Sequence, residues 1–531
     1  MRQLTSVVDV RDELYRANRT TMLARLADID ALLEPGRRGG SEASVARHRA
    51  RGRLLARERI ELLVDPHSHF FELSPLAAWG TDFAVGASLI TGIGVISDIE
   101  CVIIANDPTV RGGTMNPYTS RKSLRAMAIA AQNRLPLIQL TESGGGDLPT
   151  QAESFVDGGR MFMDLSRLSL AKIPTIDVVF GNATAGGAYQ PGMSDYAILV
   201  RGHSKVFLGG PPLVKMATGE IADAEELGGA DMHASVSGTA DYVAGDELDA
   251  LRIARDVVTH LRWERAGYEP ISEVDEPLHD PEDLLGIVSA DVRVPFDPGE
   301  VIARITDGSR FEEFKPSFGP TLMTGWAYVH GFPVGLIANR GILFAEAADK
   351  AAQFIGLCNQ RDIPLIFMQN TTGFMVGKAH EQRGIIKAGS RMLRAVSNSS
   401  VPRITLMMGA SYGAGHYGMS GRGYFPRFVL AWPNQRVGIM GPRQMAGVLS
   451  IVAREKAERT GQIFDEAADA ERQRIIEQQL ERESDALFAT GRMWDDGIID
   501  PRDTRTVLGI CLSAVHNAPV VGSTDLGPVR A

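Results

Sequence analysis

Cysteine is scarce in this chain of 531 residues, which contains only Cys101, Cys358 and Cys511. An odd number of widely separated cysteines argues against a disulfide framework and a CxxC zinc or redox pair, so we expect three small buried side chains. Long hydrophobic runs are also missing. The first residues lack an apolar signal-peptide core, and no uninterrupted apolar run reaches the roughly 18 residues of a membrane span. We therefore expect a cytoplasmic protein without a membrane partner.

Positive charge is in deficit. The chain has 55 Lys and Arg against 65 Asp and Glu, a net charge of -10. Because phosphate backbones are bound by basic faces, nucleic acid is not an expected partner. The hydrophobic content of 44% and charged content of 23% exclude a disordered or fibrous chain. The length predicts two to four domains, and the 56 glycines exceed the usual share of about 7% without a collagen period.

The chain contains an internal repeat. The segment LPLI at 135–138 resembles IPLI at 363–366, and IPTI at 173–176 resembles VPRI at 401–404, each pair being 228 residues apart. The same spacing links Gly181 with Gly409, Gly187 with Gly415, Tyr189 with Tyr417, and Tyr196 with Tyr424. Further upstream the spacing grows to 233 and then 241, as loop insertions would produce. We predict two copies of one domain, 1–270 and 271–531.

Each copy has the same order of predicted elements. A short β-rich run at 101–104 or 334–337 precedes a helical stretch at about 120–133 or 345–361. Strands beginning after a proline follow, at 136–141 and 174–180 in the first copy and at 364–369 and 402–408 in the second. Apolar strands that alternate with helices indicate βαβ units with parallel pairing, so the predicted fold class is α/β.

A glycine-rich turn follows the last of these strands in both copies, at 182–189 and 409–417. A turn without Cβ atoms lets backbone N–H groups approach a ligand, and such groups at the start of a helix favour negative charge. The turns are therefore candidate oxyanion holes. The alternative is that the glycines only permit a tight turn or close packing. Neither turn fits the GxxxxGK[ST] pattern of a P-loop.

Several long motifs resemble the carboxyltransferase β subunit of biotin-dependent acyl-CoA carboxylases. They are the segments 184–189, 207–220, 227–230 and 237–238, the opening segment 50–60, and the closing segment 500–509. The segment 413–422, with Trp432-Pro433, looks closest to the 3-methylcrotonyl-CoA carboxylase type. The resemblance implies two tandem crotonase-like domains of the ββα-superhelix kind, with the acyl-CoA side in 1–270 and the biotin side in 271–531.

The same resemblance implies partners and cofactors. A biotinylated α subunit would carry biotin carboxylase and the carrier domain, and would use ATP and bicarbonate. This chain would form a homo-hexamer within an α6β6 complex, with active sites between two subunits. Coenzyme A would enter as part of the substrate, and no metal is expected in this subunit. The charged stretch 454–483 is typical of solvated helix faces with ion pairs, with a contact to the α subunit as the alternative.

The implied reaction moves CO₂ from carboxybiotin to a CoA thioester and creates two anions, a thioester enolate and a biotin ureido anion. By family analogy, the N–H groups of Gly186 and Gly187 hold the thioester oxygen, and those of Ala414 and Gly415 hold the biotin carbonyl. Biotin N1 would act as the base. This would explain the lack of an obvious catalytic histidine or carboxylate pair in the sequence.

The candidate substrate-binding residues flank these turns; they are Ala185, Ala188, Gly144, Gly145, Tyr417 and Lys215. Lys215 is either a contact to a CoA phosphate or a solvated lysine. Gly144 and Gly145 line the acyl pocket or serve turn chemistry alone. Arg111 is either a ligand contact or part of loop packing, and for His416 a structural role is favoured over a role in acyl choice.

The predicted substrate is a branched α,β-unsaturated acyl-CoA, because Tyr417 lies where subunits of the propionyl type usually carry an Asp. Such a substrate would place the protein in leucine degradation or wider lipid metabolism. Another or longer acyl-CoA remains an alternative, since one methylene changes pocket binding by only about 1–3 kcal/mol. A biotin-dependent decarboxylase and a non-enzymatic scaffold for the biotinylated partner are further alternatives. A hydratase lacks a clear acid–base carboxylate in this sequence.

Overall fold

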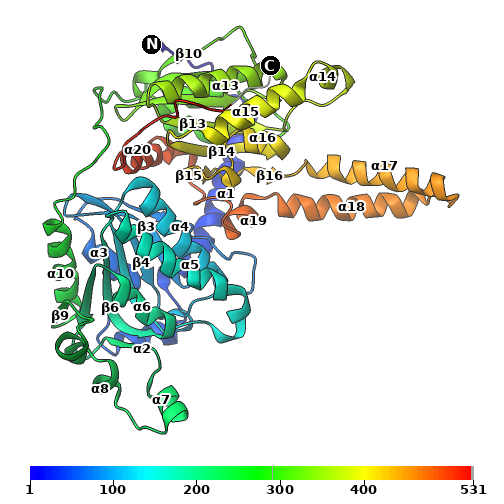
Figure 1. Cartoon of the computed structure of the whole chain (residues 1–531). Helices are drawn as coiled ribbons and strands as arrows, with labels where there is room; N and C mark the ends of the chain where they lie inside the picture. The colour runs from blue at the N-terminus through cyan, green and yellow to red at the C-terminus, as the bar shows by residue number, and fades with distance from the viewer. Residues whose placement is uncertain (290, 528–531) are drawn as a thin grey trace. The chain divides into compact units, whose positions relative to one another are not determined.

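The computed structural model describes residues 1–289 and 291–527 and contains two compact units. Unit 2 comprises residues 29–267 and 513–518, and unit 1 comprises residues 1–28, 268–512 and 519–531. Each unit is built on an eight-stranded mixed sheet with helices on it (Figure 1). The predicted α/β fold class with parallel strand pairs is therefore confirmed.

The sheet of unit 2 has the order β2-β3-β4-β5-β6-β7-β9, with β8 also paired to β6. The first three strands are antiparallel and the rest are parallel. Left-handed Ser97 and Asp98 close the two-residue hairpin between β3 and β4, which suits the strand twist. The bounds are β2 (Phe70–Leu73), β3 (Leu89–Ile96), β4 (Ile99–Asn106), β5 (Leu137–Ser143), β6 (Thr175–Thr184), β7 (Tyr196–Val200), β8 (Lys205–Phe207) and β9 (Tyr242–Ala244).

Helices of unit 2 cover this sheet and bury its β-branched side chains in one core. The Asn116 side chain accepts hydrogen bonds from the first turn of α4, and left-handed Arg134 ends that helix, so the chain returns to the sheet as β5. The main helices are α2 (Glu42–Arg49), α3 (Ala56–Leu63), α4 (Pro117–Asn133), α5 (Gln151–Leu170), α6 (Tyr189–Met193), α7 (Pro211–Thr218), α8 (Ala224–Gly228), α9 (Ala230–Met232) and α10 (Glu247–His260).

The sheet of unit 1 has the order β1-β10-β11-β12-β13-β14-β15, with β16 also paired to β14. In register, β13 pairs Leu365 with Arg403 of β14, just as β5 pairs Leu137 with Thr175 of β6. The bounds are β1 (Arg2–Gln3), β10 (Arg310–Glu313), β11 (Leu322–Val329), β12 (Phe332–Asn339), β13 (Leu365–Thr371), β14 (Arg403–Tyr412), β15 (Phe428–Ala431) and β16 (Arg436–Gly438).

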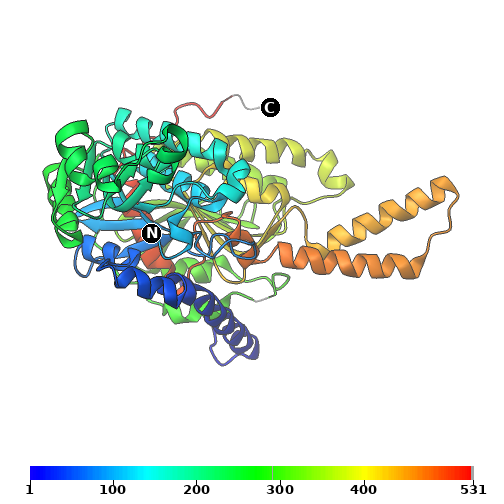
Figure 2. The same cartoon turned by 90° about the horizontal axis from the view of Figure 1, so that it is seen from below.

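The helices of unit 1 include a long hairpin, α17 and α18, that extends away from its sheet (Figure 2). Ion pairs on it, such as Arg454 with Glu466 and Arg474 with Glu471, confirm the predicted solvated charged faces. The helices are α11 (Leu284–Ile287), α12 (Pro298–Ile305), α13 (Ala345–Gln360), α14 (Lys378–Gln382), α15 (Ile385–Asn398), α16 (Gly413–Gly418), α17 (Pro442–Thr460), α18 (Glu466–Glu483), α19 (Ala486–Gly491) and α20 (Thr504–Val515).

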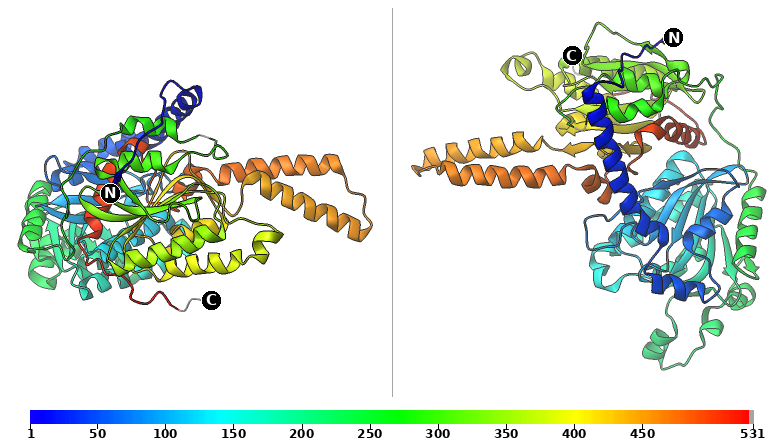
Figure 3. Two further views of the ribbon diagram at one scale, coloured as in Figure 1. Left: turned by 90° about the horizontal axis from the view of Figure 1, so that it is seen from above. Right: turned by 180° about the vertical axis from the view of Figure 1, so that it is seen from behind.

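The chain ends depart from the predicted domain ranges. Residues 1–28, expected in the first domain, belong to unit 1 because β1 pairs with β10 and Ser6 donates to Glu300 at 2.6 Å. Helix α1 (Glu13–Arg38) begins in unit 1 and ends in unit 2 (Figure 3, right). Residues 513–518 likewise belong to unit 2, where Asn517 donates to Glu100.

The sequence predicted buried cysteines and no membrane-spanning helix. All three cysteines are buried, as predicted. Within the described residues, no helix combines the length and apolar character needed to cross a bilayer.

One buried arginine links the elements of unit 2. Arg59 on α3 is fully buried and lies 2.8 Å from both Glu142 of β5 and Glu247 of α10. Its guanidinium also lies 4.3 Å from the ring centroid of Phe180. Removing one member of a buried charged group leaves the others uncompensated, which is usually strongly destabilising.

We predict that Arg59→Leu lowers the unfolding free energy of unit 2 by about 3–5 kcal/mol. Arg57→Leu on the same helix is the matched control, because the Arg57–Glu72 pair is partly exposed and should contribute at most about 1 kcal/mol. Urea denaturation of both variants measures the difference. Equal losses in the two variants would contradict the role of Arg59.

Candidate functional site

The first glycine turn follows β6 directly. Ala185 has a left-handed φ of +55°, and residues 185–188 then form one helical turn that leads into α6. The first N–H groups of a helical turn have no partner within it. A Cβ built on Gly187 would meet nothing within 4 Å, whereas one on Gly186 would lie 3.4 Å from the Phe162 ring. The turn is therefore open at Gly187.

Gly187 lines a small cavity of about 20 Å³ together with Gly145, which follows β5. Gly145 has a φ of +96°, which a residue with a side chain rarely adopts. The two turns meet because β5 and β6 are parallel neighbours with Ser143 opposite Ala183. The structure thus brings together one predicted catalytic residue and one predicted substrate-binding residue. The other residues that line this small cavity are Leu89, Ile104, Asn106, Met115, Thr119, Ser123, Gln139, Thr141, Ser143 and Gln190.

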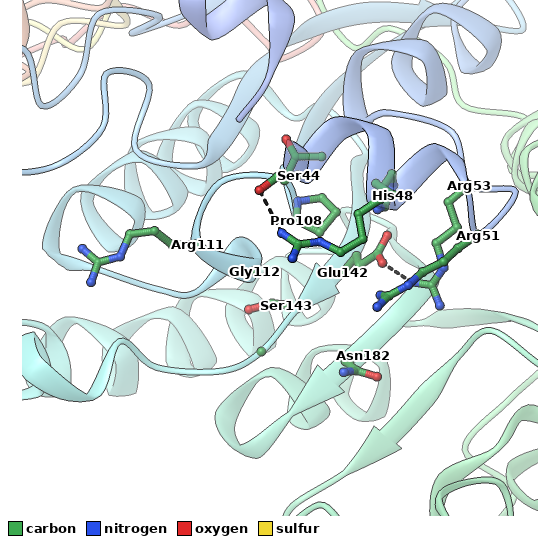
Figure 4. A pocket seen from close by; sticks show the side chains of 13 residues that line it. Ser44, His48, Arg51, Arg53, Pro108, Arg111, Gly112, Glu142, Ser143 and Asn182 are labelled. Carbon is green, nitrogen blue, oxygen red and sulfur yellow. Dashed lines mark hydrogen bonds and ion pairs between the residues drawn. The ribbon is translucent and has the colours of Figure 1, made fainter. Parts of the chain in front are cut away.

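A larger pocket of about 480 Å³ shares Ser143 with the small cavity. We call it the arginine pocket, because four guanidinium groups line it and Glu142 is its one carboxylate (Figure 4). Its residues are Ser44, Arg47, His48, Arg51, Arg53, Pro108, Thr109, Arg111, Gly112, Glu142, Ser143, Gly144 and Asn182. Predicted Gly144 and Arg111 lie here, and Arg111 also approaches Asp147 at 3.4 Å.

Local structure fixes the arginines of this pocket. The Ser41 side chain caps α2 by accepting a hydrogen bond from the backbone N–H of Ser44. The Arg47 guanidinium donates a hydrogen bond of 3.2 Å to the Ser44 hydroxyl. Arg53 forms an ion pair with Glu142 at the end of β5. Burial alone would raise the pKa of Glu142, but Arg59 and Arg53 hold it below its ordinary value. Glu142 therefore stays ionised and neutralises only part of the pocket.

The second glycine turn lies in unit 1, after β14. Gly413 has a φ of +57°, and a Cβ on Gly415 would lie 2.8 Å from the Cα of Gly373. Gly415 is therefore required by packing, unlike Gly187. His416 has a structural environment, as favoured from the sequence: its Nδ1 lies 2.8 Å from the Ser411 hydroxyl, and burial lowers its pKa to about 4.

The remaining predicted residues have distinct surroundings. Tyr417 of unit 1 is half exposed and stacks on Tyr424 at 5.9 Å between centroids. Ala414, also in unit 1, lies on α16 beside Gly415. In unit 2 the Ala188 methyl belongs to an apolar cluster with Val179. Lys215 is exposed on α7 and lines neither the small cavity nor the arginine pocket.

Sequence reasoning missed Arg47, Arg51, Arg53 and Gln139 as site residues. The three arginines lie within or next to the opening segment, where closely spaced arginines ahead of an apolar helix were the available signal. Gln139 is the one polar residue in the run LIQL at 137–140, with which β5 begins. That interruption was visible in the sequence, and the structure places it in the small cavity.

Asp177 of β6 yields a stability prediction. Burial raises its pKa to about 7 from an ordinary value of 3.8, and the Thr141 hydroxyl acts in the opposite direction. The unfolded state therefore loses this proton at lower pH than the folded state, so stability should fall as the pH rises from about 4 to 7. We expect Asp177→Asn to remove this loss, which amounts to at most about 4 kcal/mol. The melting temperature of the variant minus that of wild type should therefore increase from pH 5 to pH 8. A pH-independent difference would contradict the assignment.

Comparisons with known proteins agree with this geometry. The family model described as "Carboxyl transferase domain" matches residues 47–524. A Mycobacterium tuberculosis protein named "Probable biotin-dependent acyl-coenzyme A carboxylase beta2 subunit" is 59% identical over 528 residues, covering 99% of this chain and 100% of that protein. The biotin-dependent 3-methylcrotonyl-coenzyme A carboxylase beta1 subunit of the same organism is 48% identical over 501 residues, covering 93% and 94%.

A solved structure is also similar. The crystal structure of the P. aeruginosa geranyl-CoA carboxylase beta subunit has a TM-score of 0.90 and 44% sequence identity, covering 98% of this chain and 99% of that one. The resemblance found in the motifs is confirmed over nearly the whole length. This chain belongs to the carboxyl transferase family of biotin-dependent acyl-CoA carboxylase β subunits.

Proposed function

We propose that this chain moves CO₂ from carboxybiotin, carried by a partner subunit, to the acyl group of an acyl-CoA. One observation carries the proposal: Gly145 and Gly187 meet in a small cavity that shares Ser143 with the arginine pocket. A thioester held beside Gly187 at the edge of the small cavity, with its charged, phosphorylated handle in the arginine pocket, fits this arrangement. Family membership supports the same activity.

The reaction requires stabilisation of a thioester enolate. In this proposal the N–H groups of Gly186 and Gly187 donate to the thioester oxygen, while Gly145 and Ala185 keep the turn geometry around it. The absence of any neighbour around a Cβ at Gly187 leaves room for the thioester. Donors of this kind are worth about 3–4 kcal/mol each to a transition state. The proton is taken by biotin N1, so no carboxylate beside the turn has to act as the base.

The phosphates of coenzyme A would bind in the arginine pocket. A planar guanidinium group can bind two phosphate oxygens at once. The pocket is lined by four guanidinium groups and by one carboxylate, Glu142, whose charge offsets only part of theirs. The pantetheine arm would then pass the shared residue Ser143 toward Gly187. Arg47, Arg51 and Arg111 are exposed, and of these Arg111 is already 3.4 Å from Asp147, so a phosphate could reach Arg47 and Arg51 most directly. Lys215 stays a secondary candidate on α7.

Biotin would bind at the second glycine turn, where the N–H groups of Ala414 and Gly415 hold its carbonyl oxygen. The His416 ring stabilises this turn through its contact with the Ser411 hydroxyl, which in turn donates a hydrogen bond to Gln369. A neutral imidazole suits this role, since its low pKa keeps it uncharged at neutral pH. Exposed Tyr417 would contact the ligand at the edge of the turn.

We infer that the two units are copies of one crotonase-like domain, with the acyl-CoA side in unit 2 and the biotin side in unit 1. Left-handed residues recur 228 positions apart: Arg134 and Asp362, Gly145 and Gly373, Ala185 and Gly413. The register shift between Thr141 and Ser143 recurs between Gln369 and Thr371. Buried Lys122 and Lys350 follow the same spacing.

A homo-hexamer that joins six biotinylated α subunits is the assembly we propose. Unit 2 exposes large apolar side chains that a solitary protein would not favour, including Phe155, Val156, Met216 and Ile221 at more than 80% exposure or close to it. Neighbouring subunits would cover them. The cytoplasm is the proposed location.

The proposed acyl group is branched and α,β-unsaturated, of the 3-methylcrotonyl kind. Relatives named 3-methylcrotonyl- and geranyl-CoA carboxylase subunits support it, because both acyl groups have this character. Another or longer acyl-CoA, a decarboxylase, or a scaffold role are the competing functions. Supplying the chain and its α subunit with ATP, labelled bicarbonate and a panel of acyl-CoAs tests all of them; no label fixed on any would favour the scaffold.

Gly187→Ala tests the first oxyanion hole. The new methyl meets no protein atom, so the fold should be kept while the thioester is displaced, and we expect carboxyl transfer to fall by about 10²–10³-fold. Gly192→Ala on α6, which follows this turn, is the control, because its Cβ is equally free and lies outside the small cavity. Equal activity of the two variants in folded complexes would overturn the assignment.

Arg51→Met tests the phosphate site. We expect KM for the acyl-CoA to rise about tenfold with little change in kcat, because the lost contact is made equally in ground and transition states. With the matching acyl-pantetheine, which lacks the phosphates, variant and wild type should have the same KM. Arg49→Met is the control, since Arg49 pairs with Glu58 and does not line the pocket. A KM increase with both thioesters would argue against phosphate binding.

A further inference from the structure

Polar side chains line part of the small cavity, which lies between the sheet of unit 2 and α4. Thr119 and Ser123 enter it from one face of α4, and Gln139 and Thr141 enter it from β5. All four side chains are buried. Buried polar groups carry a desolvation cost, so their presence at this position requires a reason.

The fold itself does not impose this polarity. Three neighbouring strands of unit 2 place Ile104, Gln139 and Asp177 side by side in register, which we call the strand row. The matching row of unit 1 pairs Ile337 with Phe367, and Phe367 with Thr405. Gln139 thus has an apolar counterpart in the same strand arrangement.

The helix that packs on this row is also more polar in unit 2 than in unit 1. At the 228-residue spacing, the counterparts of Thr119 and Ser123 are Ala347 and Ala351 on α13, both fully buried. Three polar side chains of the small cavity are therefore replaced by alanine and phenylalanine in unit 1, where the strands have the same order and register.

One side chain of this row lacks a hydrogen-bond partner within the described structure. The Nε2 atom of Gln139 has none, although the residue is only 2% exposed and lines the small cavity. A buried donor left unpaired costs about 1–3 kcal/mol, so the arrangement is suited to a ligand that supplies the missing bond.

The charge and size of the cavity restrict that ligand. The described residues that line the cavity include no Lys, Arg or His, so a carboxylate in it would stay uncompensated. The volume of about 20 Å³ fits one water-sized group. A hydroxyl group meets both conditions, because it is neutral, is the size of a water molecule, and can accept a hydrogen bond from the Gln139 amide while donating one to a neighbouring hydroxyl oxygen.

We propose that the acyl-CoA accepted by this chain carries a hydroxyl group on its acyl chain, bound by Gln139 in the small cavity. The inference rests on the proposed carboxyltransferase function and narrows its substrate class. Gln139 then acts as a specificity residue: it selects among acyl-CoAs and takes no part in the proton or CO₂ transfer.

The test compares 3-methylcrotonyl-CoA with its 4-hydroxy derivative, which keeps one carboxylatable methyl group. Calorimetric binding and carboxylation are measured on the complex of this chain with its α subunit. We expect the hydroxylated thioester to bind about tenfold more tightly and to have a correspondingly higher kcat/KM. Gln139→Met, which keeps the length and volume of the side chain, should abolish this preference.

Gln132→Met is the matched control. Gln132 lies on α4 with an unpaired buried Oε1 atom but does not line the small cavity, so this variant should keep the preference. Equal binding of the two thioesters by wild type, or a preference that survives in Gln139→Met, would overturn the proposal and indicate that the cavity holds only water. If both thioesters bind with the expected preference but no label is transferred to either, the proposed carboxyl transfer fails while the specificity inference stands.

Discussion

The parallel pairing of β5 with β6 is the constraint on which the site depends. Parallel neighbours end at the same edge of a sheet, so the turns that follow them must lie side by side. Gly145 and Gly187 are 42 positions apart in the chain, yet they line one small cavity for this reason. The buried Arg59 reinforces the pairing, because it binds Glu142 just before the first of these turns. Strand direction, more than any single side chain, therefore creates the site.

The two units illustrate how one strand arrangement supports two different turns. At Gly187 the space beside the backbone is open, whereas at Gly415 it is filled by Gly373. The central side chain of the strand row is Gln139 in unit 2 and Phe367 at the matching position of unit 1. If the units are copies, the strand arrangement has been kept while the side chains and the free space next to the glycine turn have changed. An open turn suits a ligand that enters deeply, and a packed turn suits one that is held at its surface.

Much of the fold was predictable because it is local. Proline before a strand and glycine after it mark the ends of β5, β6, β13 and β14, and the apolar runs between them leave little choice of structure. Residues 1–28 were assigned to the wrong unit because β1 pairs with β10, more than 300 residues away, and no local pattern reports such a pairing.

The site was predictable only in its backbone. The glycine turns have a sequence signature, whereas the arginine pocket is assembled from α2 and the segment after it, the residues 108–112, the end of β5 and β6. Lys215 looked equally plausible as a phosphate contact from the sequence, but the structure places it outside that pocket. Gln139 could be recognised as unusual in its strand, but only the packing of α4 against β4 reveals that it faces a cavity.

Glu142 connects the electrostatics of ligand binding with the integrity of the core. One side of its carboxylate faces Arg53 in the arginine pocket, and the other faces Arg59 under the sheet. Deleting this charge to make the pocket more cationic would leave Arg59 with a single partner. Selection for tighter anion binding cannot easily act at this position, and is directed toward solvent-exposed positions such as Arg47 and Arg51. The shared carboxylate thus separates the part of the pocket that can evolve from the part that must stay fixed.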